Sequence, residues 1–397
     1  MRDVCVHARR FVLPRGVVRE GYLLIEGGRF SSFTAEKPVG VGEGGVALVD
    51  EGDAWVAPGL VDTHIHGFFG HATTDEDAEG IRLASEELAR RGTTTWLPTT
   101  FTDATDAIAR QCAAIARAAS GQSHDGDVAA HVGGIFLEGP FFTLRHAGAQ
   151  NPEFLCDPSV ETLRRWQDVA EGRVVKSAFA PERCGAAAYA GEAARAGVVA
   201  AIAHTDATYE QCLDAVAAGA TVFVHTYNGM RGLHHREPGV VGAAMTTRDT
   251  YAEVICDGLH VRPGAVAALV AAKGWDHVVL ITDCLGCGGL PDGDYMSGGL
   301  PVEMRDGACY LKEGGNLAGS ILTLAEAVRN VCDWGVVGPE QALRMATEVP
   351  ARACGIAATC GAIEVGREAD LAVFSGDLEL RATYVGGERL AATSVPR

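Results

Sequence analysis

Short apolar runs alternate with Ala-rich amphipathic stretches through the middle of the chain, from about Pro58 to Gly355. Continuous apolar runs predict strands that are buried on both faces, and amphipathic stretches between them predict helices that cover a sheet. Eight strand–helix units in succession predict a TIM-like (β/α)8 barrel in the α/β class. The predicted strands are 60–62, 93–99, 134–138, 174–180, 198–204, 221–225, 251–256 and 277–283, and the predicted helices include 80–91, 103–120, 160–171, 186–196, 209–218 and 264–273.

An open, doubly wound sheet is the alternative arrangement of such units. It is less favoured because no G-x-G-x-x-G turn follows the first predicted strand. We find no short-period repeat and no low-complexity linker in this region. The middle of the chain is therefore expected to form one barrel-sized domain.

The two ends of the chain have a different pattern, in which apolar and polar residues alternate over short runs. Gly-Gly pairs follow two of these runs and are hairpin signals. We predict one small β-sandwich domain formed by residues 1–57 and 356–397, beside a barrel of residues 58–355. The alternating runs include Tyr22–Glu26, Val46–Asp50, Asp370–Phe374 and Arg381–Val385.

The charge balance restricts the class of partner. The chain has 397 residues and a formal net charge of −18, with a pI near 5.1. An acidic chain offers no general basic surface, so nucleic acid and anionic membranes are not expected as partners. An anionic small substrate stays open, because a few arginine and histidine side chains can reverse the sign of the potential inside one cleft.

The absence of a targeting signal and the pattern of cysteines favour a cytoplasmic protein. No apolar run approaches the roughly 20 residues that span a bilayer, and the N-terminus lacks an apolar signal core. Twelve scattered cysteines do not form the framework of a small secreted domain. Cys284 and Cys287 form a C-x-x-C, but no second pair follows at zinc-ribbon spacing. We interpret this pair as small side chains in a Gly-rich loop.

Candidate chemistry begins at the end of the first predicted strand, with His64 and His66. Side chains at i and i+2 of a strand point the same way, so both imidazoles aim at one point. Neutral imidazole is the commonest protein metal ligand, and two on one face supply half of a divalent-metal site. A polar strand end is the alternative, unless the rest of the chain supplies further ligands.

Four further predicted strands end in Glu138, His204, His225 and Asp283. Active sites of (β/α)8 barrels lie at the C-terminal ends of the strands, so these side chains are expected at one rim. Three histidine or glutamate ligands with an open position suit a hydrolytic metal, because the open position holds water and lowers its pKa. Asp283 is then the expected general base, which returns the proton to a leaving amine.

A set of motifs in order along the chain resembles the amidohydrolase superfamily, most closely its N-acetylglucosamine-6-phosphate deacetylase branch. The β-rich ends also resemble the split sandwich of that family. The resemblance implies a metal-dependent hydrolase of amino-sugar metabolism that removes the N-acetyl group from an amino sugar 6-phosphate. The resembling motifs are Pro58–Gly67, Leu137–Phe141, His204–Thr208, His225–Met230, Arg236–Gly239, Asp257–Val261, Thr282–Asp283 and Leu317–Ser320.

The resemblance also implies a metal centre. By position, Glu138, His204 and His225 match the ligands of the main metal in the family. His64 and His66 match a second metal position that some members fill. The implied cofactor is therefore one or two divalent ions, with zinc expected first and iron or another ion left open.

The same resemblance implies where the substrate binds. Asn228, the backbone of Gly229, His260 and Arg236 match positions that hold the sugar phosphate. In the family this arginine reaches in from the neighbouring subunit, which implies a homodimer with a shared site. Taken alone, Arg236 is more typical of a surface arginine in a turn next to Pro238. A guanidinium nevertheless suits a phosphate, because it offers a planar fork of donors.

One position departs from the family pattern. Gln150 stands where the family usually has a histidine that approaches the acyl carbonyl. Glutamine can donate a hydrogen bond to an oxyanion, but it cannot become cationic. We therefore expect Gln150 to bind the acyl group as a neutral donor. The departure keeps open a related amidohydrolase that acts on another N-acyl or cyclic amide in a specialised pathway.

A barrel without catalysis, serving as a scaffold, is the hypothesis from another functional class. A scaffold has no need of Asp283 beside a complete set of metal ligands, so the sequence favours the enzyme.

Overall fold

The computed structural model describes residues 3–42, 45–121 and 128–393. Each of the eight apolar runs predicted for the middle of the chain forms a strand, and all of these strands pair in parallel. One sheet has the order β10-β9-β6 and the other runs from β11 to β16. The eight strands are β6 (Leu60–Ile65), β9 (Thr93–Pro98), β11 (Ile135–Leu137), β12 (Val174–Phe179), β13 (Val199–Ile202), β14 (Ala220–Phe223), β15 (Tyr251–Ile255) and β16 (Val278–Ile281). The short strand β10 (His131–Val132) was not predicted and pairs with β9.

Isolated parallel bridges join the two parallel sheets at both edges. Thr99, just after β9, pairs with Phe136 of β11, and Ile65 of β6 pairs with Cys284, just after β16. The C-terminal ends of the first and eighth predicted strands are therefore neighbours, although more than 200 residues separate Ile65 from Cys284. This proximity brings motifs from distant parts of the chain to one end of the sheets.

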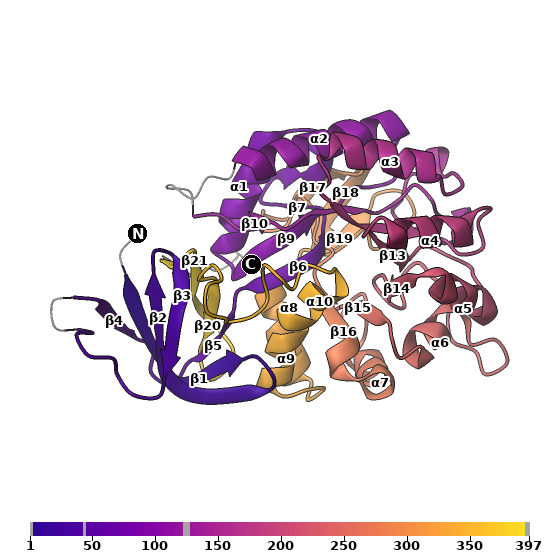
Figure 1. The fold of residues 1–397 in the computed structure, drawn as a ribbon. Helices are drawn as coiled ribbons and strands as arrows, with labels where there is room; N and C mark the ends of the chain where they lie inside the picture. Colours follow the sequence, from indigo (N-terminus) through magenta and orange to yellow (C-terminus); the bar gives the residue numbers. More distant parts are fainter. Residues whose placement is uncertain (1–2, 43–44, 122–127, 394–397) are drawn as a thin grey trace.

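Helices cover the outer faces of the parallel strands (Figure 1). The six predicted helices are present, and the described residues form four more that follow or lie between them. The additional helix α6 is buried along most of its length, so its sequence is apolar and lacks an amphipathic period. The helices are α1 (Ala78–Ala89), α2 (Thr105–Gly121), α3 (Val160–Val169), α4 (Ala186–Arg195), α5 (Tyr209–Ala218), α6 (Gly239–Thr246), α7 (Pro263–Lys273), α8 (Leu324–Asp333), α9 (Pro339–Met345) and α10 (Glu348–Ala353).

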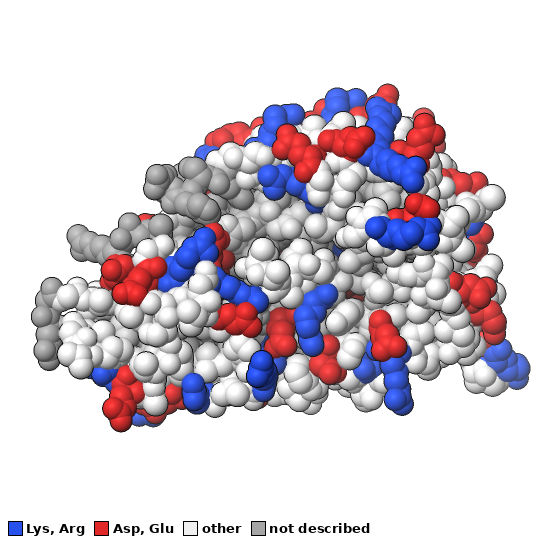
Figure 2. Space-filling model, in the orientation of Figure 1, with Lys and Arg blue, Asp and Glu red and all other residues white. Residues whose placement is uncertain are grey.

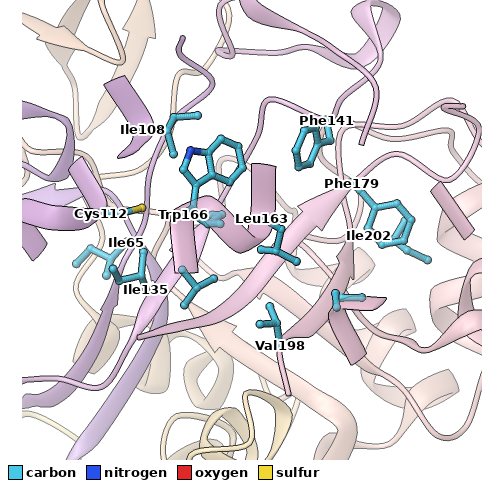
Figure 3. Packing of buried hydrophobic residues seen from close by; sticks show 14 of the residues in the cluster. Ile65, Ile108, Cys112, Ile135, Phe141, Leu163, Trp166, Phe179, Val198 and Ile202 are labelled. Carbon is cyan, nitrogen blue, oxygen red and sulfur yellow. The ribbon is translucent and has the colours of Figure 1, made fainter. Parts of the chain in front are cut away.

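The main core lies between the helices and the parallel strands. Figure 3 shows Leu163 and Trp166 of α3 near Ile135 of β11, with Ile108 of α2 close by. Trp166 is fully buried, and its indole N–H donates to the carbonyl of Thr105 at 2.9 Å. A buried tryptophan with its polar atom satisfied fixes the contact between α2 and α3.

Strands from both ends of the chain form one further sheet (Figure 1). Its order is β22-β21-β20-β5-β1-β2-β3, with β4 paired to β1. The predicted Gly-Gly hairpins lie between β2 and β3 and between β21 and β22. The strands are β1 (Val4–Leu13), β2 (Val17–Glu26), β3 (Arg29–Thr34), β4 (Ala47–Asp50), β5 (Trp55–Pro58), β20 (Leu371–Phe374), β21 (Leu380–Val385) and β22 (Glu388–Ala391).

Small elements that the sequence did not predict complete the fold. An antiparallel sheet of β17 (Gly293–Ser297), β18 (Leu300–Arg305) and β19 (Ala308–Leu311) follows β16 and packs its buried residues against Phe101. Within this packing, Sγ of Cys287 lies 3.9 Å from Sγ of Cys309. The remaining elements are strands β7 (Gly67–Phe68) and β8 (His71–Ala72) and 3₁₀ turns at Thr73–Asp75, Leu144–His146, Pro152–Phe154 and Trp275–His277.

The surface is mixed in charge despite the acidic composition. On the face drawn in Figure 2, basic and acidic side chains alternate without a single-sign patch. Within the described ranges, no helix combines the length and apolar character needed to cross a bilayer.

Candidate active site

The parallel strands deliver the predicted metal ligands to one place. Glu138 follows β11 directly, whereas His204, His225 and Asp283 each stand two residues beyond the end of their strand. The histidines of the first motif lie at the end of β6 and just after it. Because all of these strands run in the same direction, their C-terminal ends share one edge, as the sequence predicts.

Glu138, His204 and His225 form the first cluster of candidate ligands. Oε1 of Glu138 lies 3.3 Å from Nε2 of His204 and 3.1 Å from Nε2 of His225. The two Nε2 atoms are 3.1 Å apart, and all three side chains are buried. Two imidazole nitrogens and a carboxylate oxygen that converge at this spacing fit a divalent cation.

His64, His66 and Asp283 form the second cluster. Oδ1 of Asp283 lies 3.3 Å from Nε2 of His64 and 3.2 Å from Nε2 of His66. The two Nε2 atoms are 3.3 Å apart. Glu138 also faces this group, since its Oε2 is 3.2 Å from Nε2 of His66. The two clusters are therefore adjacent, with Glu138 between them.

Left-handed backbone conformations turn three of these side chains toward the common centre. The φ angle is 44° at His204, 30° at His225 and 50° at Asp283. Non-glycine residues rarely adopt positive φ, and each such residue costs on the order of 1–3 kcal/mol. Such strain is typical of functional sites, where the surrounding fold enforces it.

Backbone carbonyls orient two of the imidazoles. Nδ1 of His204 is 2.8 Å from the carbonyl oxygen of His146, and Nδ1 of His66 is 3.2 Å from that of Thr99. A carbonyl only accepts, so each Nδ1 carries the hydrogen and each Nε2 keeps its lone pair for a metal. Gly229 is also required here, because a Cβ at that position would lie 2.9 Å from Nδ1 of His204.

The charges of the site keep its carboxylates ionised. Burial by itself raises the pKa of Glu138, but the charge of His64 and the contacts with His204 and His225 outweigh it and hold this pKa well below the usual value. The pKa of Asp283 is lowered for the same kind of reason, since His64 and His66 outweigh its burial. Both carboxylates are therefore available as ligands or as a base at neutral pH.

The proton on His64 competes with a metal. Burial lowers the pKa of this imidazole, but the charges of Glu138 and Asp283 raise it overall to about 10. A divalent cation supplies the positive charge that these carboxylates require and displaces the proton from Nε2. Metal binding at this cluster is thus expected to release a proton and to weaken at low pH.

A cavity of about 150 Å³ opens over the two clusters. It brings together most of the predicted substrate-binding residues with the metal ligands. Loop residues 317–319, from the Leu317–Ser320 motif, also line it. The predicted site residues that line it are His66, Glu138, Gln150, His204, His225, Asn228, Gly229, His260 and Asp283.

His260 reaches the cavity with its orientation fixed. Its Nδ1 lies 2.6 Å from Oδ2 of Asp257, and its backbone N–H donates to Oδ1 of the same carboxylate at 2.8 Å. Burial lowers the pKa of His260, but Asp257 outweighs it and raises the pKa overall. A histidine held in this way favours an anionic group in the cavity.

Gln150 lies at the cavity wall with both ends of its amide engaged. Its Oε1 accepts the backbone N–H of Thr102 at 2.7 Å, and its Nε2 donates to Oε2 of Glu138 at 2.8 Å. The sequence predicts a contact with substrate here. The structure adds that Gln150 also holds a metal-ligand candidate in place.

Among the predicted substrate-binding residues, Arg236 is the one that does not line the cavity. It is exposed in a tight turn where His234 and Glu237 exchange backbone hydrogen bonds of 3.2 and 3.1 Å. In the part of the chain that the structure describes, its guanidinium forms no ion pair. The side chain can therefore contact a group outside the cavity of its own chain.

Three buried polar residues near the site were missed by the sequence reasoning. Asp62 accepts from the Thr282 hydroxyl at 2.6 Å, which ties β6 to the loop of the catalytic aspartate candidate. Lys176 and Glu253 form an ion pair with a separation of 2.5 Å. The sequence did contain a signal for all three, because each is a charged residue inside a predicted buried strand. A charge that is buried in this way requires a partner.

Comparisons with known proteins agree with this geometry. The amidohydrolase family model matches residues 55–390. An N-acetylglucosamine-6-phosphate deacetylase from Vibrio furnissii is 39% identical over 339 residues, covering 85% of this chain and 84% of the relative. An N-acetylgalactosamine-6-phosphate deacetylase from Escherichia coli O157:H7 is 34% identical over 384 residues, covering 96% and 98%.

A solved structure extends the likeness to the whole fold. A mutant N-acetyl-D-glucosamine-6-phosphate deacetylase from Mycobacterium smegmatis, in complex with N-acetyl-D-glucosamine-6-phosphate, superposes with a TM-score of 0.89. It is 30% identical, and the match covers 98% of this chain and all of that one. The mixed α/β fold, the adjacent ligand clusters and the extent of these matches lead to one conclusion. The chain belongs to the amidohydrolase family.

Proposed function

We propose that this protein is a metal-dependent hydrolase that removes the N-acetyl group from an amino sugar 6-phosphate. The observation that carries the proposal is the position of Asp283, which lies beside buried histidines and Glu138 at the floor of a small cavity. A carboxylate base next to a cation site is the arrangement that amide hydrolysis requires. The relatives named as deacetylases of amino sugar 6-phosphates support this choice of substrate.

Glu138, His204 and His225 would hold the main divalent ion, and His64 and His66 with Asp283 would hold a second. Zinc suits a set of imidazole and carboxylate ligands, and iron or another divalent ion fits the same donors. When bound, the ion supplies Lewis acidity, which lowers the pKa of water and polarises a carbonyl.

The residues of the chain carry the proton and the charge. Asp283 takes a proton from the attacking water, and the C–N bond of the amide breaks as Asp283 delivers that proton to the leaving nitrogen. Water thus becomes part of the released acetate, and the free amino sugar phosphate leaves. The amide of Gln150 has a second N–H, and we assign it to the developing negative charge on the acyl oxygen.

The phosphate would bind at His260, Asn228 and the backbone of Gly229, which line the cavity. Arg236 of a second subunit would complete the phosphate contacts. The exposed position of Arg236 and its lack of an ion pair within the described chain support this assignment. We therefore propose a homodimer with shared sites. A local cluster of this kind attracts an anion to an otherwise acidic protein.

We also propose that the enzyme is cytoplasmic and that it consists of two domains. The bridges at Thr99 and Ile65 support a closed (β/α)8 barrel of residues 58–355. The sheet built from both termini supports a separate β-sandwich domain of residues 1–57 and 356–397.

Acetate release tests the function directly. We expect the purified, metal-loaded protein to release acetate from N-acetylglucosamine 6-phosphate, and we expect a chelator to abolish this activity until a divalent ion is restored. N-acetylgalactosamine 6-phosphate belongs in the same assay, because one relative carries that name. Failure to hydrolyse either compound, with Zn²⁺, Mn²⁺ or Fe²⁺ present, would contradict the proposal.

Gln150 supports a second candidate within the same reaction class. Because a neutral amide replaces the family's usual histidine beside Glu138, the acyl group or the amine can differ from the sugar substrate. A panel of other N-acyl amines and cyclic amides tests this candidate. Hydrolysis of a panel member at a higher kcat/KM than either sugar phosphate would favour it.

A further inference from the structure

Lys176 and Glu253 form an ion pair within the parallel strands. They lie on β12 and β15, and their exposed fractions are 0% and 1%. Nζ of Lys176 donates to Oε1 of Glu253 at 2.5 Å and to the carbonyl oxygen of Thr63 at 2.8 Å. Neither residue takes part in the proposed hydrolysis of the amide. A buried ion pair needs a reason, because desolvation of two charges is costly.

The other oxygen of Glu253 faces the first metal-ligand motif. Its Oε2 lies 3.4 Å from Nδ1 of His64. Neither of these two atoms has a hydrogen-bond partner elsewhere in the described part of the chain. Each is thus the nearest available partner for the other, and a small adjustment of the imidazole forms the bond.

This arrangement sets His64 apart from two other candidate metal ligands, His66 and His204. Nδ1 of His66 and Nδ1 of His204 meet neutral backbone carbonyls. A carboxylate on Nδ1 fixes the imidazole tautomer and makes Nε2 a stronger metal ligand. That Nε2 is the atom of His64 that lies 3.3 Å from Asp283 and 3.3 Å from His66.

Lys176 explains how a third carboxylate is tolerated in this region. Glu253 approaches the site that already contains Glu138 and Asp283. The ammonium of Lys176 lies 2.5 Å from Oε1 of Glu253 and supplies the opposite charge. The lysine also ties Glu253 to the strand of His64, through the carbonyl of Thr63.

We propose that Glu253, anchored by Lys176, is a positioning residue that prepares His64 to bind a second divalent ion together with His66 and Asp283. The inference rests on the proposed function only in assuming that the site holds divalent metal. It assigns the ion pair to the second metal position, because among the described residues the side chain of Glu253 forms ion pairs with His64 and Lys176 and with none of the three ligands of the first position.

Metal titration of Glu253→Gln tests the inference. The isosteric amide keeps the volume but removes the charge that Lys176 and His64 require. With Zn²⁺ as the probe, we expect the wild-type protein to bind two ions per chain. We expect the variant to keep the first ion and to bind the second about 10–100-fold more weakly. Stoichiometry by elemental analysis and affinity by chelator competition measure this without any substrate.

Glu51→Gln is the matched control. Glu51 is also a buried glutamate with a basic partner, since it accepts from Arg389 at 3.0 Å and from Tyr384 at 3.2 Å. It lies in the terminal sheet region, away from the cavity, so its variant should bind both ions normally. The ¹⁵N shifts of the His64 imidazole give a second readout, because loss of the carboxylate should change its tautomer.

A double variant keeps the test valid if Glu253→Gln does not fold. Lys176→Met with Glu253→Leu replaces the ion pair by apolar side chains of similar size, a change that buried ion pairs often tolerate. It should fold, keep the first ion and lose the second. Normal affinity for the second ion in either folded variant, or a wild-type stoichiometry of one, would overturn the inference. Absence of deacetylase activity would instead contradict the proposed function and leave this result standing.

Discussion

Gln150 donates a hydrogen bond from its Nε2 to Oε2 of Glu138, across 2.8 Å. This contact joins the predicted acyl-binding side chain to the carboxylate that lies between the two ligand clusters. The amide is held from its other end by the backbone N–H of Thr102. Gln150 therefore positions Glu138 in addition to facing the cavity.

Replacement of Gln150 by leucine should weaken metal binding at the first cluster by about 10–100-fold, because Glu138 loses the donor that orients it. The protein should also lose about 1–3 kcal/mol of unfolding free energy, since the N–H of Thr102 is left buried without a partner. Chelator competition and urea unfolding measure the two effects. Unchanged affinity for Zn²⁺ in Gln150→Leu would show that Glu138 needs no support from this side chain.

Replacement of Asp283 by asparagine should lower kcat by about 10²–10⁴-fold, because the amide cannot accept the proton of the attacking water. Asp257→Asn makes a contrasting variant, since it removes the charge next to His260 but leaves Asp283 intact. That variant should mainly raise KM for the sugar phosphate. Steady-state kinetics at saturating metal separate the two results, and a fall in kcat confined to Asp257→Asn would reverse our assignment of roles.

Arg236 provides a test of the shared site. Arg236→Met should raise KM for a phosphorylated substrate and leave hydrolysis of the non-phosphorylated sugar unchanged. A heterodimer of Arg236→Met and Asp283→Asn chains is purified through two different tags, and its KM and kcat/KM for the phosphorylated substrate are measured. If the arginine acts across the interface, one site carries both changes and the other carries neither, so the heterodimer should show about half of the wild-type kcat/KM at an unchanged KM. A KM raised to that of Arg236→Met would place Arg236 in the site of its own chain.

Much of this site could be predicted from the sequence, because its residues follow recognisable strands. Buried parallel strands have apolar runs, and the ligand candidates stand at or just beyond the ends of those runs. The spacing of His64 and His66 predicted a shared direction, and their Nε2 atoms are indeed 3.3 Å apart. Local pattern is sufficient in these cases, since the topology of parallel strands brings their ends together.

The remaining features depend on contacts between distant segments. The left-handed backbone at His204 and His225 has no local sequence signal, because these residues do not favour positive φ. The pairing of Lys176 with Glu253 joins residues 77 positions apart. Helix α6 was missed because burial on all sides removes the amphipathic period. In each case the tertiary structure determines the outcome, and a local pattern cannot report it.

His131 predicts a pH dependence of stability away from the cavity. Its Nε2 lies 3.2 Å from Oδ2 of Asp370 and 3.3 Å from Oε2 of Glu368, which links β10 to the terminal sheet. Burial lowers the pKa of His131, but Asp370 and Glu368 outweigh it and raise the pKa from 6.5 to about 9. Because the folded value is the higher one, the stabilisation is complete below about pH 6.5 and is lost as the pH rises through about 9.

Urea unfolding of wild type and His131→Gln at about pH 6 and about pH 10 checks this prediction. The variant should be less stable than wild type at the lower pH, and the difference should shrink at the higher pH. A difference that is the same at both pH values would mean that the charge of His131 does not stabilise the contact between β10 and the terminal sheet.

The most direct test of the central claim compares one sugar with and without its phosphate. Acetate release by the metal-loaded wild-type protein is measured for N-acetylglucosamine 6-phosphate and for N-acetylglucosamine, and the two values of kcat/KM are compared. We predict a preference of at least about 10²-fold for the phosphorylated sugar, since hydrogen bonds to a charged group contribute roughly 1.5–3 kcal/mol each. Equal kcat/KM for both sugars, or no acetate from either, would contradict the account.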